Sequence, residues 1–299
     1  MTWRNLAASL SLASFCILLF GQNDDELAIK KFESLIEAGS YTDAAAPLAK
    51  YTADHPQSWR ALYQLGYIDF RLHRFGESLA LLSRSLVINQ NFAESHKILA
   101  FDLNILGRGD LAIQELQRAI VLEPRSFESH YELGRIYYDR ASYVKAVEEL
   151  EQAKTLNAGV VKVYHNLGLA YAGVGDNRKA VENFEEGLTL NTKQSTRSAW
   201  PLIDYGTYFN LQGEFAKARD MLQQSIAISD RWDQAFSELC KAYRGLGQTE
   251  PAIKSLQRAI AINPSKAEYH YALARLYSQT NEKAKASQEL TLYEIARKK

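Results

Sequence analysis

Residues 163–190 read VYHNLGLAYAGVGDNRKAVENFEEGLTL, and this stretch decides the fold. Gly168 lies in its first half and Ala180 in its second, and Phe184 follows Ala180 by four residues. Two amphipathic helices can cross closely where small residues meet, and a large apolar side chain then fills the space beside the crossing. Gly175, between the two runs, is typical of a residue that ends a helix. The stretch therefore predicts two packed helices joined by a short turn.

The same pattern recurs along the chain with a period of 34 residues. The small residue of the second helix recurs at Ala44, Ser78, Ala112, Ala146, Ala180, Ala218, Ala252 and Ala286. The large apolar residue four positions later recurs at Leu48, Leu82, Leu116, Leu150, Phe184, Leu222, Leu256 and Leu290. One step is 38 residues long, which predicts a four-residue insertion at 195–198. A fixed period of this length is the signature of a stacked repeat array, in which each module buries its apolar face against its neighbours.

Glycine and proline mark the ends of the predicted helices in the same register. The turn glycines are Gly39, Gly107, Gly175, Gly213 and Gly247, and the helix-ending prolines are Pro56, Pro124 and Pro264. Glycine readily adopts the left-handed conformation that ends a helix, and proline cannot continue one. Each module is therefore predicted to be a helix, a turn and a second helix.

This pattern resembles the tetratricopeptide repeat (TPR) family, most clearly in the Leu167-Gly168, Tyr171, Ala180 and Phe184 positions. The resemblance implies an all-α fold, a superhelix or solenoid of about eight TPR helix-turn-helix units. We place these units at residues 25–58, 59–92, 93–126, 127–160, 161–194, 199–232, 233–266 and 267–299. The first and last units depart from the family pattern, as expected of terminal repeats whose outer faces meet water.

Composition excludes several classes of function. Acidic and basic residues balance at 35 each, so no net charge points to nucleic acid or to an anionic membrane surface. The two cysteines, Cys16 and Cys240, give no disulfide framework, because Cys16 belongs to the N-terminal apolar segment. Once that segment and the repeats are assigned, only residues 195–198 remain, which leaves no room for a catalytic domain.

The N-terminal segment, residues 1–24, is predicted to be a signal peptide or an N-terminal membrane anchor. Arg4 provides a positive start, and Leu6 to Phe20 is a run of 15 residues without charge. A membrane-spanning helix needs about 20 apolar residues, so the shorter run favours a signal peptide. We therefore expect an exported protein, periplasmic or secreted, that contacts a membrane only if this segment stays uncleaved.

The resemblance also implies where a ligand would bind. In the family, the first helices line a concave groove, and the fifth, ninth and twelfth residues of each unit face it. The groove residues predicted in this way are Tyr63, Tyr67, Phe70, Lys97, Phe101, Asn104, Tyr131, Arg135, Tyr138, His165, Asn166, Lys241, Arg244, Tyr271 and Arg275. Asn166 matches one position of the carboxylate clamp of some family members, but Phe101 stands where the clamp has asparagine, so the full clamp is missing.

These residues suggest a ligand with two kinds of contact. Tyrosine and phenylalanine supply large contact areas at low entropic cost, and cations pair with acidic groups. We expect an extended or helical polypeptide held by apolar anchors, with an acidic portion near Lys241, Arg244 and Arg275. The alternative is that the tyrosines fill the packing between repeats and that the cations are simply solvated.

The histidines and carboxylates that could act in catalysis or bind a metal are dispersed along the sequence. His96, His130 and His270 each occupy the fourth position of a unit, where partly buried structural histidines are expected rather than metal ligands. Paired carboxylates such as Glu148-Glu149 are expected on solvated helix faces. Without a convergent set of polar groups, the sequence predicts no enzyme, no metal and no cofactor.

The sequence therefore predicts a scaffold that binds a protein or peptide, with no nucleic acid as a partner. The alternative is a structural or self-assembling component of a cell-envelope complex that uses its ends or its convex face, and self-assembly would make it a homo-oligomer.

Overall fold

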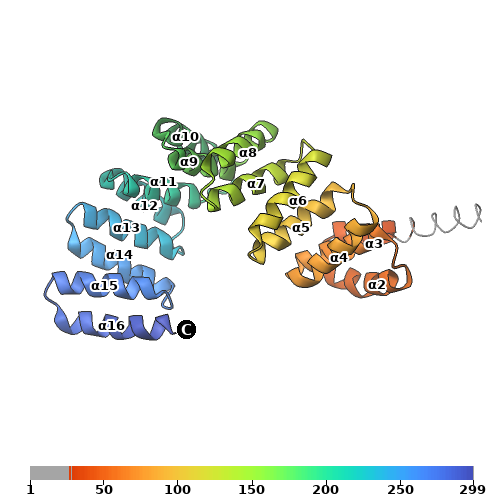
Figure 1. Ribbon diagram of the computed structural model, residues 1–299. Helices are drawn as coiled ribbons and strands as arrows, with labels where there is room; N and C mark the ends of the chain where they lie inside the picture. The colour runs from red at the N-terminus through yellow and green to blue at the C-terminus, as the bar shows by residue number, and fades with distance from the viewer. Residues whose placement is uncertain (1–26, 28, 299) are drawn as a thin grey trace, which may run out of the picture. The chain divides into compact units, whose positions relative to one another are not determined.

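The computed structural model describes residue 27 and residues 29–298, and the predicted signal segment lies outside these described residues. Residues 29–37 are helical, and they are followed by a regular succession of helices (Figure 1). The helices are α2 (Tyr41–Asp54), α3 (Trp59–Arg71), α4 (Phe75–Ile88), α5 (Ala93–Ile105), α6 (Gly109–Leu122), α7 (Phe127–Asp139), α8 (Tyr143–Leu156), α9 (Val161–Val174), α10 (Asn177–Thr192), α11 (Trp200–Leu211), α12 (Phe215–Ile228), α13 (Asp233–Gly245), α14 (Thr249–Ile262), α15 (Ala267–Gln279) and α16 (Lys283–Arg297). No strand occurs among the described residues, so the predicted all-α repeat fold is confirmed.

The chain forms two compact parts. We call them the N-terminal half, up to Ile136, and the C-terminal half, from Tyr137 onward. The boundary falls within α7. In each half, helices that follow one another in the chain pack against one another, as the apolar stripes of the sequence require.

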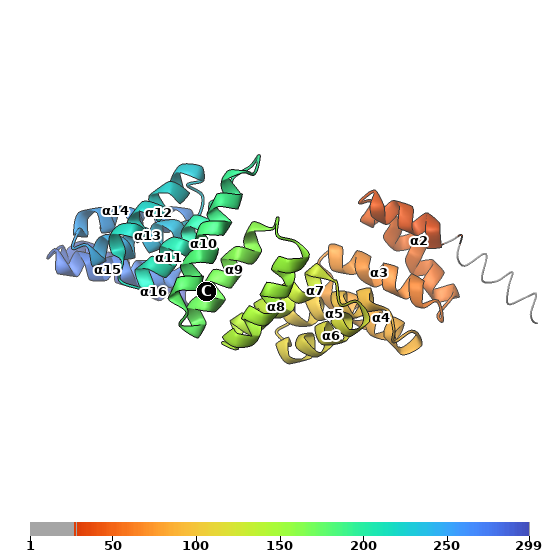
Figure 2. The same ribbon diagram turned by 90° about the horizontal axis from the view of Figure 1, so that it is seen from above.

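Within each half, the helices that begin the repeats also lie side by side. In the N-terminal half α3 contacts α5, and in the C-terminal half α11 contacts both α9 and α13 (Figure 2). The second helix of each repeat lies on the other side, as α4 and α6 do where they pack on α5. The first helices thus form one face within each half, which we call the first-helix face.

The turns inside the repeats share one backbone conformation at one sequence position. Gly39, Gly107, Gly175, Gly213 and Gly247 all have φ between 73° and 91°, as their role in ending a helix predicts. The three remaining repeats hold His73, Ala141 and Asn281 at the same position, with φ of 61°, 55° and 62°. Because this left-handed region is unfavourable for residues with a Cβ, the packing of the two helices imposes the turn even where glycine is absent.

Close helix crossings explain the periodic small and large residues. A Cβ added to Gly168 would lie 2.7 Å from the Phe184 ring, and one added to Gly206 would lie 2.7 Å from Leu222. The periodic large residue is fully or almost fully buried in seven repeats, but Leu290 in α16 is 44% exposed. Leu290 differs because no helix follows α16 among the described residues to cover it.

The irregular step in the period forms a loop between α10 and α11. The buried Asn191 side chain closes this loop: its amide nitrogen donates to the Ser198 carbonyl (2.8 Å) and its oxygen accepts from the Ser198 N–H (3.0 Å). Four extra residues are thus absorbed without exposing backbone groups in the core. Within the described part of the chain, no helix combines the length and apolarity needed to cross a membrane.

Candidate functional site

An aromatic group occupies the first-helix face of the N-terminal half. The structure brings together Tyr63, Tyr67 and Phe70 of α3 with Phe101 of α5, all of them half-buried. Ring centroids lie 6.3 Å apart for Tyr63 and Tyr67 and 6.0 Å apart for Phe70 and Phe101. Arg71 donates to the Tyr67 hydroxyl at 2.8 Å and holds that ring in place. Half-exposed rings fixed by their neighbours offer contact area with little entropy left to lose on binding.

The two predicted cations of this half are paired within their own helices. Lys97 donates to Glu94 at 2.6 Å, and Arg135 donates to Glu132 at 2.8 Å. Each pair spans three residues on one helix face, a spacing at which side chains meet. Their charges are therefore already compensated before any ligand arrives.

The other two predicted residues of this half differ in exposure. Tyr131 is only 5% exposed and its ring stacks on Phe127 at 5.8 Å, so it packs against its own helix. Asn104, near the end of α5, is half-buried.

In the C-terminal half, α9 and α11 are joined by an ion pair that sequence reasoning missed. The Nε2 of His165 lies 2.6 Å from Oδ2 of Asp204, and both side chains are mostly buried. Burial raises the pKa of the Tyr138 hydroxyl, and the nearby Tyr143, Asp139 and Asp204 raise it further. Tyr138 therefore lies close enough to Asp204 to feel its charge. Asn166 is half-buried beside this pair in the sequence of α9. Asp204 lies one position past the predicted groove column, so the column rule alone could not single it out.

A second carboxylate that sequence reasoning missed is Glu238, which links α13 to α11. Its side chain is nearly buried, accepts from Lys241 at 2.6 Å and accepts from the Asn210 amide of α11 at 3.1 Å. The signal was present in the sequence, since Glu238 precedes Lys241 by three residues on one helix face. Lys241 is therefore held in a defined position rather than left to move freely.

Lys241 and Arg244 line a pocket at the C-terminal end of α13. Its volume is about 380 Å³, and its other lining residues are Phe215, Gly245, Thr249, Leu276 and Gln279. A Cβ on Gly245 would overlap the Phe215 ring, so only glycine leaves that ring in place as a wall. Two of the predicted groove cations are thus brought together.

The remaining predicted residues lie on α15. Tyr271 is 46% exposed and packs on Tyr293 of α16 at 5.4 Å, and Arg275 is exposed. Neither lines the pocket formed by Lys241 and Arg244.

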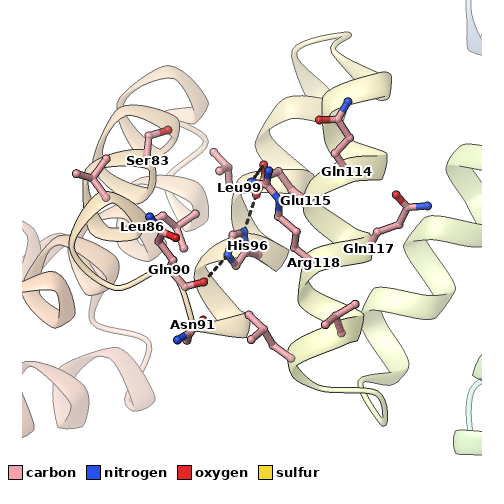
Figure 3. A pocket seen from close by; sticks show the side chains of 13 residues that line it. Ser83, Leu86, Gln90, Asn91, His96, Leu99, Gln114, Glu115, Gln117 and Arg118 are labelled. Atoms are coloured by element: carbon pink, nitrogen blue, oxygen red, sulfur yellow. Dashed lines mark hydrogen bonds and ion pairs between the residues drawn. The ribbon is translucent and has the colours of Figure 1, made fainter.

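A larger pocket, of about 870 Å³, lies on the opposite side of the N-terminal half, between α4 and α6 (Figure 3). Val87 and Val121 at its walls are 79% and 78% exposed. At its base, His96 lies 2.6 Å from Glu115 and 3.0 Å from the Gln90 carbonyl, and Arg118 donates to Glu115 at 3.1 Å (Figure 3). No sequence pattern indicated this pocket, because it forms where the second helices α4 and α6 meet the turn after α4 and the start of α5.

The histidines at the fourth repeat position are tied to neighbouring carbonyls. Nε2 of His130 lies 3.1 Å from the Pro124 carbonyl, and Nε2 of His270 lies 3.0 Å from the Pro264 carbonyl. His270 also repeats the carboxylate contact, with its Nδ1 2.7 Å from Glu289. These contacts join the turn before each first helix to the rest of its repeat. In the described residues, no three His, Cys, Asp or Glu side chains are grouped as metal ligands would be.

Comparison with known families agrees with this architecture. Three family models match: tetratricopeptide repeat models at residues 29–94 with 106–160 and at 159–231, and a TPR repeat model at 240–281. The chain belongs to the tetratricopeptide repeat family. Among curated protein sequences, none matches this chain.

Several solved structures share the fold of this TPR protein. A tetratricopeptide repeat protein from Parabacteroides merdae has a TM-score of 0.66 at 16% identity, covering 84% of this chain and 98% of its own. PilF of Pseudomonas aeruginosa has a TM-score of 0.57 at 20% identity, covering 73% and 97%. MamA has a TM-score of 0.51 at 26% identity, covering 54% and 95%. TPR proteins bind protein partners, so the family places this chain among interaction scaffolds.

Proposed function

We propose that this protein is an exported, non-catalytic scaffold that binds a polypeptide along its first-helix faces. The observation that carries the proposal is the aromatic group of α3 and α5, in which Tyr63, Tyr67 and Phe70 are half-exposed and held by neighbours. Rings of this kind are enriched among the few residues that dominate interface energies. An enzyme would instead need acid, base or nucleophile converging on one enclosed site.

The export part of the proposal rests on the N-terminal sequence. Arg4, the uncharged run from Leu6 to Phe20 and the polar residues that follow have the order of a signal peptide. An exported scaffold would meet its partners outside the cytoplasm or at the cell envelope.

The proposal is tested by comparing partner capture by two variants of the full chain. Proteins crosslinked to the wild type in fractionated source cells are identified, and one of them is then purified and titrated. Tyr67→Ala with Tyr138→Ala is expected to weaken binding at least tenfold, roughly the effect of losing two interface anchors, with unchanged helicity by circular dichroism. Tyr51→Ala, at a half-buried tyrosine of the second helix α2, is the matched control.

Two results would reject the proposal. Undiminished binding by the double variant would show that neither Tyr67 of the aromatic group nor Tyr138 of α7 anchors the ligand. Recovery of the protein only from the cytoplasmic fraction would reject export and leave the binding surface to be judged by the titration.

A further inference from the structure

The pocket at the end of α13 has an electrostatic character of its own. Its two charged lining residues, Lys241 and Arg244, are both basic, and no acidic side chain lines it. Lys241 is 59% exposed despite its contact with Glu238, and Arg244 is exposed with no ion-pair partner among the described residues. The pocket therefore offers one compensated cation and one uncompensated cation to a ligand.

The charge balance favours a ligand with a single negative charge. Lys241, Glu238 and Arg244 together carry one net positive charge, and Glu250 beyond Thr249 is paired with Lys254 at 3.6 Å. A carboxylate carries one negative charge, whereas a phosphorylated side chain carries about 1.5 to 2 at neutral pH. Because Glu238 is nearly buried behind Lys241, a dianion would also be repelled at close range.

The uncharged lining residues of the pocket set a second requirement for the ligand. Phe215, which is half-buried, forms apolar surface beside the cations, while Thr249 and Gln279 provide donors that a carboxylate oxygen can accept from. The volume of about 380 Å³ is at the lower end of ligand pockets and suits one or two residues rather than a larger molecule.

We propose that this pocket binds one carboxylate group of a partner polypeptide, with an apolar side chain next to that carboxylate packed on Phe215. The inference rests on the proposed scaffold function and specifies the chemistry of one contact. The guanidinium of Arg244 makes the principal charge contact, and Glu238 positions the ammonium of Lys241 beside it.

The test uses the full chain and four labelled hexapeptides that alternate serine and leucine. One has a free C-terminal carboxylate, one is amidated, one is amidated with an internal glutamate, and one is amidated with a phosphoserine. By fluorescence anisotropy, the free-acid or the glutamate peptide is expected to bind at least tenfold more tightly than the neutral amide, and whichever is preferred identifies the source of the carboxylate. Equal binding of all four peptides, or tightest binding of the phosphoserine peptide, overturns the inference.

Two variants separate this pocket from the rest of the binding face. Arg244→Glu is expected to abolish the preference for acidic peptides, whereas Arg84→Glu, at an exposed arginine of α4, is the matched charge control. Gly245→Ala changes no charge but displaces the Phe215 wall, and Gly76→Ala, where an added Cβ meets nothing, is its steric control. An acid preference that survives Arg244→Glu overturns the inference.

The outcome is independent of the aromatic group. If Tyr67→Ala with Tyr138→Ala weakens partner binding while Arg244→Glu leaves acidic peptides bound, the scaffold function stands and this pocket is wrong. If Gly245→Ala reduces helicity, Arg244→Glu alone decides, because Arg244 is exposed and no ion pair is lost with it.

Discussion

The two halves of the molecule use the same repeat but fill two neighbouring positions of the first helix differently. In the C-terminal half these positions hold apolar or aromatic residues, namely Ala170 and Tyr171, Tyr208 and Phe209, Ala242 and Tyr243, and Leu276 and Tyr277. In the N-terminal half a carboxylate occupies one of the two positions in α3, at Asp69, and in α5, at Asp102. Both aspartates are buried, at 6% and 0% exposure.

The consequences for stability are opposite in sign. In the C-terminal half, Phe184, Tyr205 and Phe209 stack with ring centroids 4.9 Å and 4.4 Å apart, which adds to the burial of their apolar area. In the N-terminal half neither carboxylate oxygen of Asp102 has a partner in good hydrogen-bond geometry, and the buried Ser78 hydroxyl acts on Asp102 only from nearby. Asp69 has Arg74 at 3.5 Å, an exposed arginine. The comparison teaches that backbone register and small crossing residues, such as Gly66 and Ala100, maintain the repeat even where the core carries charge.

Burial governs the protonation of both carboxylates. It raises the pKa of Asp102 to about 7, with Ser78 opposing and Asp69 adding to the shift. It also raises the pKa of Asp69, against the effect of Arg74. Because the folded pKa of Asp102 lies above the unfolded value, the N-terminal half keeps its full stability below pH 4 or so and loses part of it as the pH rises to about 7.

The largest expected effect is therefore a gain in stability from Asp102→Asn. Removing the ionisable group should raise the free energy of unfolding of the N-terminal half at pH 8 by roughly 2 to 3 kcal/mol, less than the full pKa shift implies, because the asparagine amide also lacks partners. At pH 4 the gain should vanish. Hydrogen exchange followed by mass spectrometry at both pH values measures the two halves separately.

The control for that experiment is Asp54→Asn, at the exposed end of α2. It should change exchange in the N-terminal half at neither pH. Equal gains from Asp102→Asn at pH 4 and pH 8 would show that the charge of Asp102 is not what weakens this half.

The next largest effect is on the stability of the C-terminal half, at the helix crossing of Gly168. Gly168→Ala should destabilise that half by roughly 2 kcal/mol, since the new Cβ would lie 2.7 Å from the Phe184 ring. Adding Phe184→Leu should restore part of the loss, because Ala100 with Leu116 is the same pair of positions packed without glycine. Urea denaturation of the single and double variants measures this coupling.

Additive losses in the double variant would contradict the steric explanation. Gly76→Ala serves as the control, since an added Cβ there has open space around it. It should change stability by less than about 1 kcal/mol, in the direction of greater helix propensity.

The sequence predicted well those features that depend on spacing alone. The period of 34 residues located the crossing residues, and the turn glycines were found with positive φ at all five predicted positions. Such features follow from helix geometry, in which residue number fixes the face of a side chain. His73, Ala141 and Asn281 show the limit of this reasoning, because they adopt the same turn without its residue type.

The candidate site was less predictable, because its chemistry depends on contacts between helices. The pairing of His165 with Asp204 joins residues on α9 and α11, and the position of Phe215 in the pocket depends on a glycine thirty residues away in α13. The placement of Lys241 by Glu238 was readable from the three-residue spacing. The predicted groove residues remain a prediction, since their roles require a ligand.

The smallest expected effect concerns a contact that the two halves share. Both ring nitrogens of His96 face acceptors, Glu115 and the Gln90 carbonyl, so both bonds can form only with the charged imidazolium. Burial lowers the pKa of His96, but these two acceptors more than offset it, and the net shift is upward. The contribution of this contact is therefore complete below about pH 6.5 and is lost as the pH rises through the folded pKa.

Glu115→Gln should accordingly cost about 1 kcal/mol in the N-terminal half at pH 6 and less at pH 9, and the pKa of His96 measured by NMR should fall. Glu289→Gln removes the equivalent contact to His270 in the C-terminal half, at 2.7 Å instead of 2.6 Å, and should cost a similar amount. Similar losses would mean that this contact does not distinguish the halves, which leaves Asp69 and Asp102 as the source of their different pH dependence. A loss confined to Glu115→Gln would instead assign part of that difference to His96.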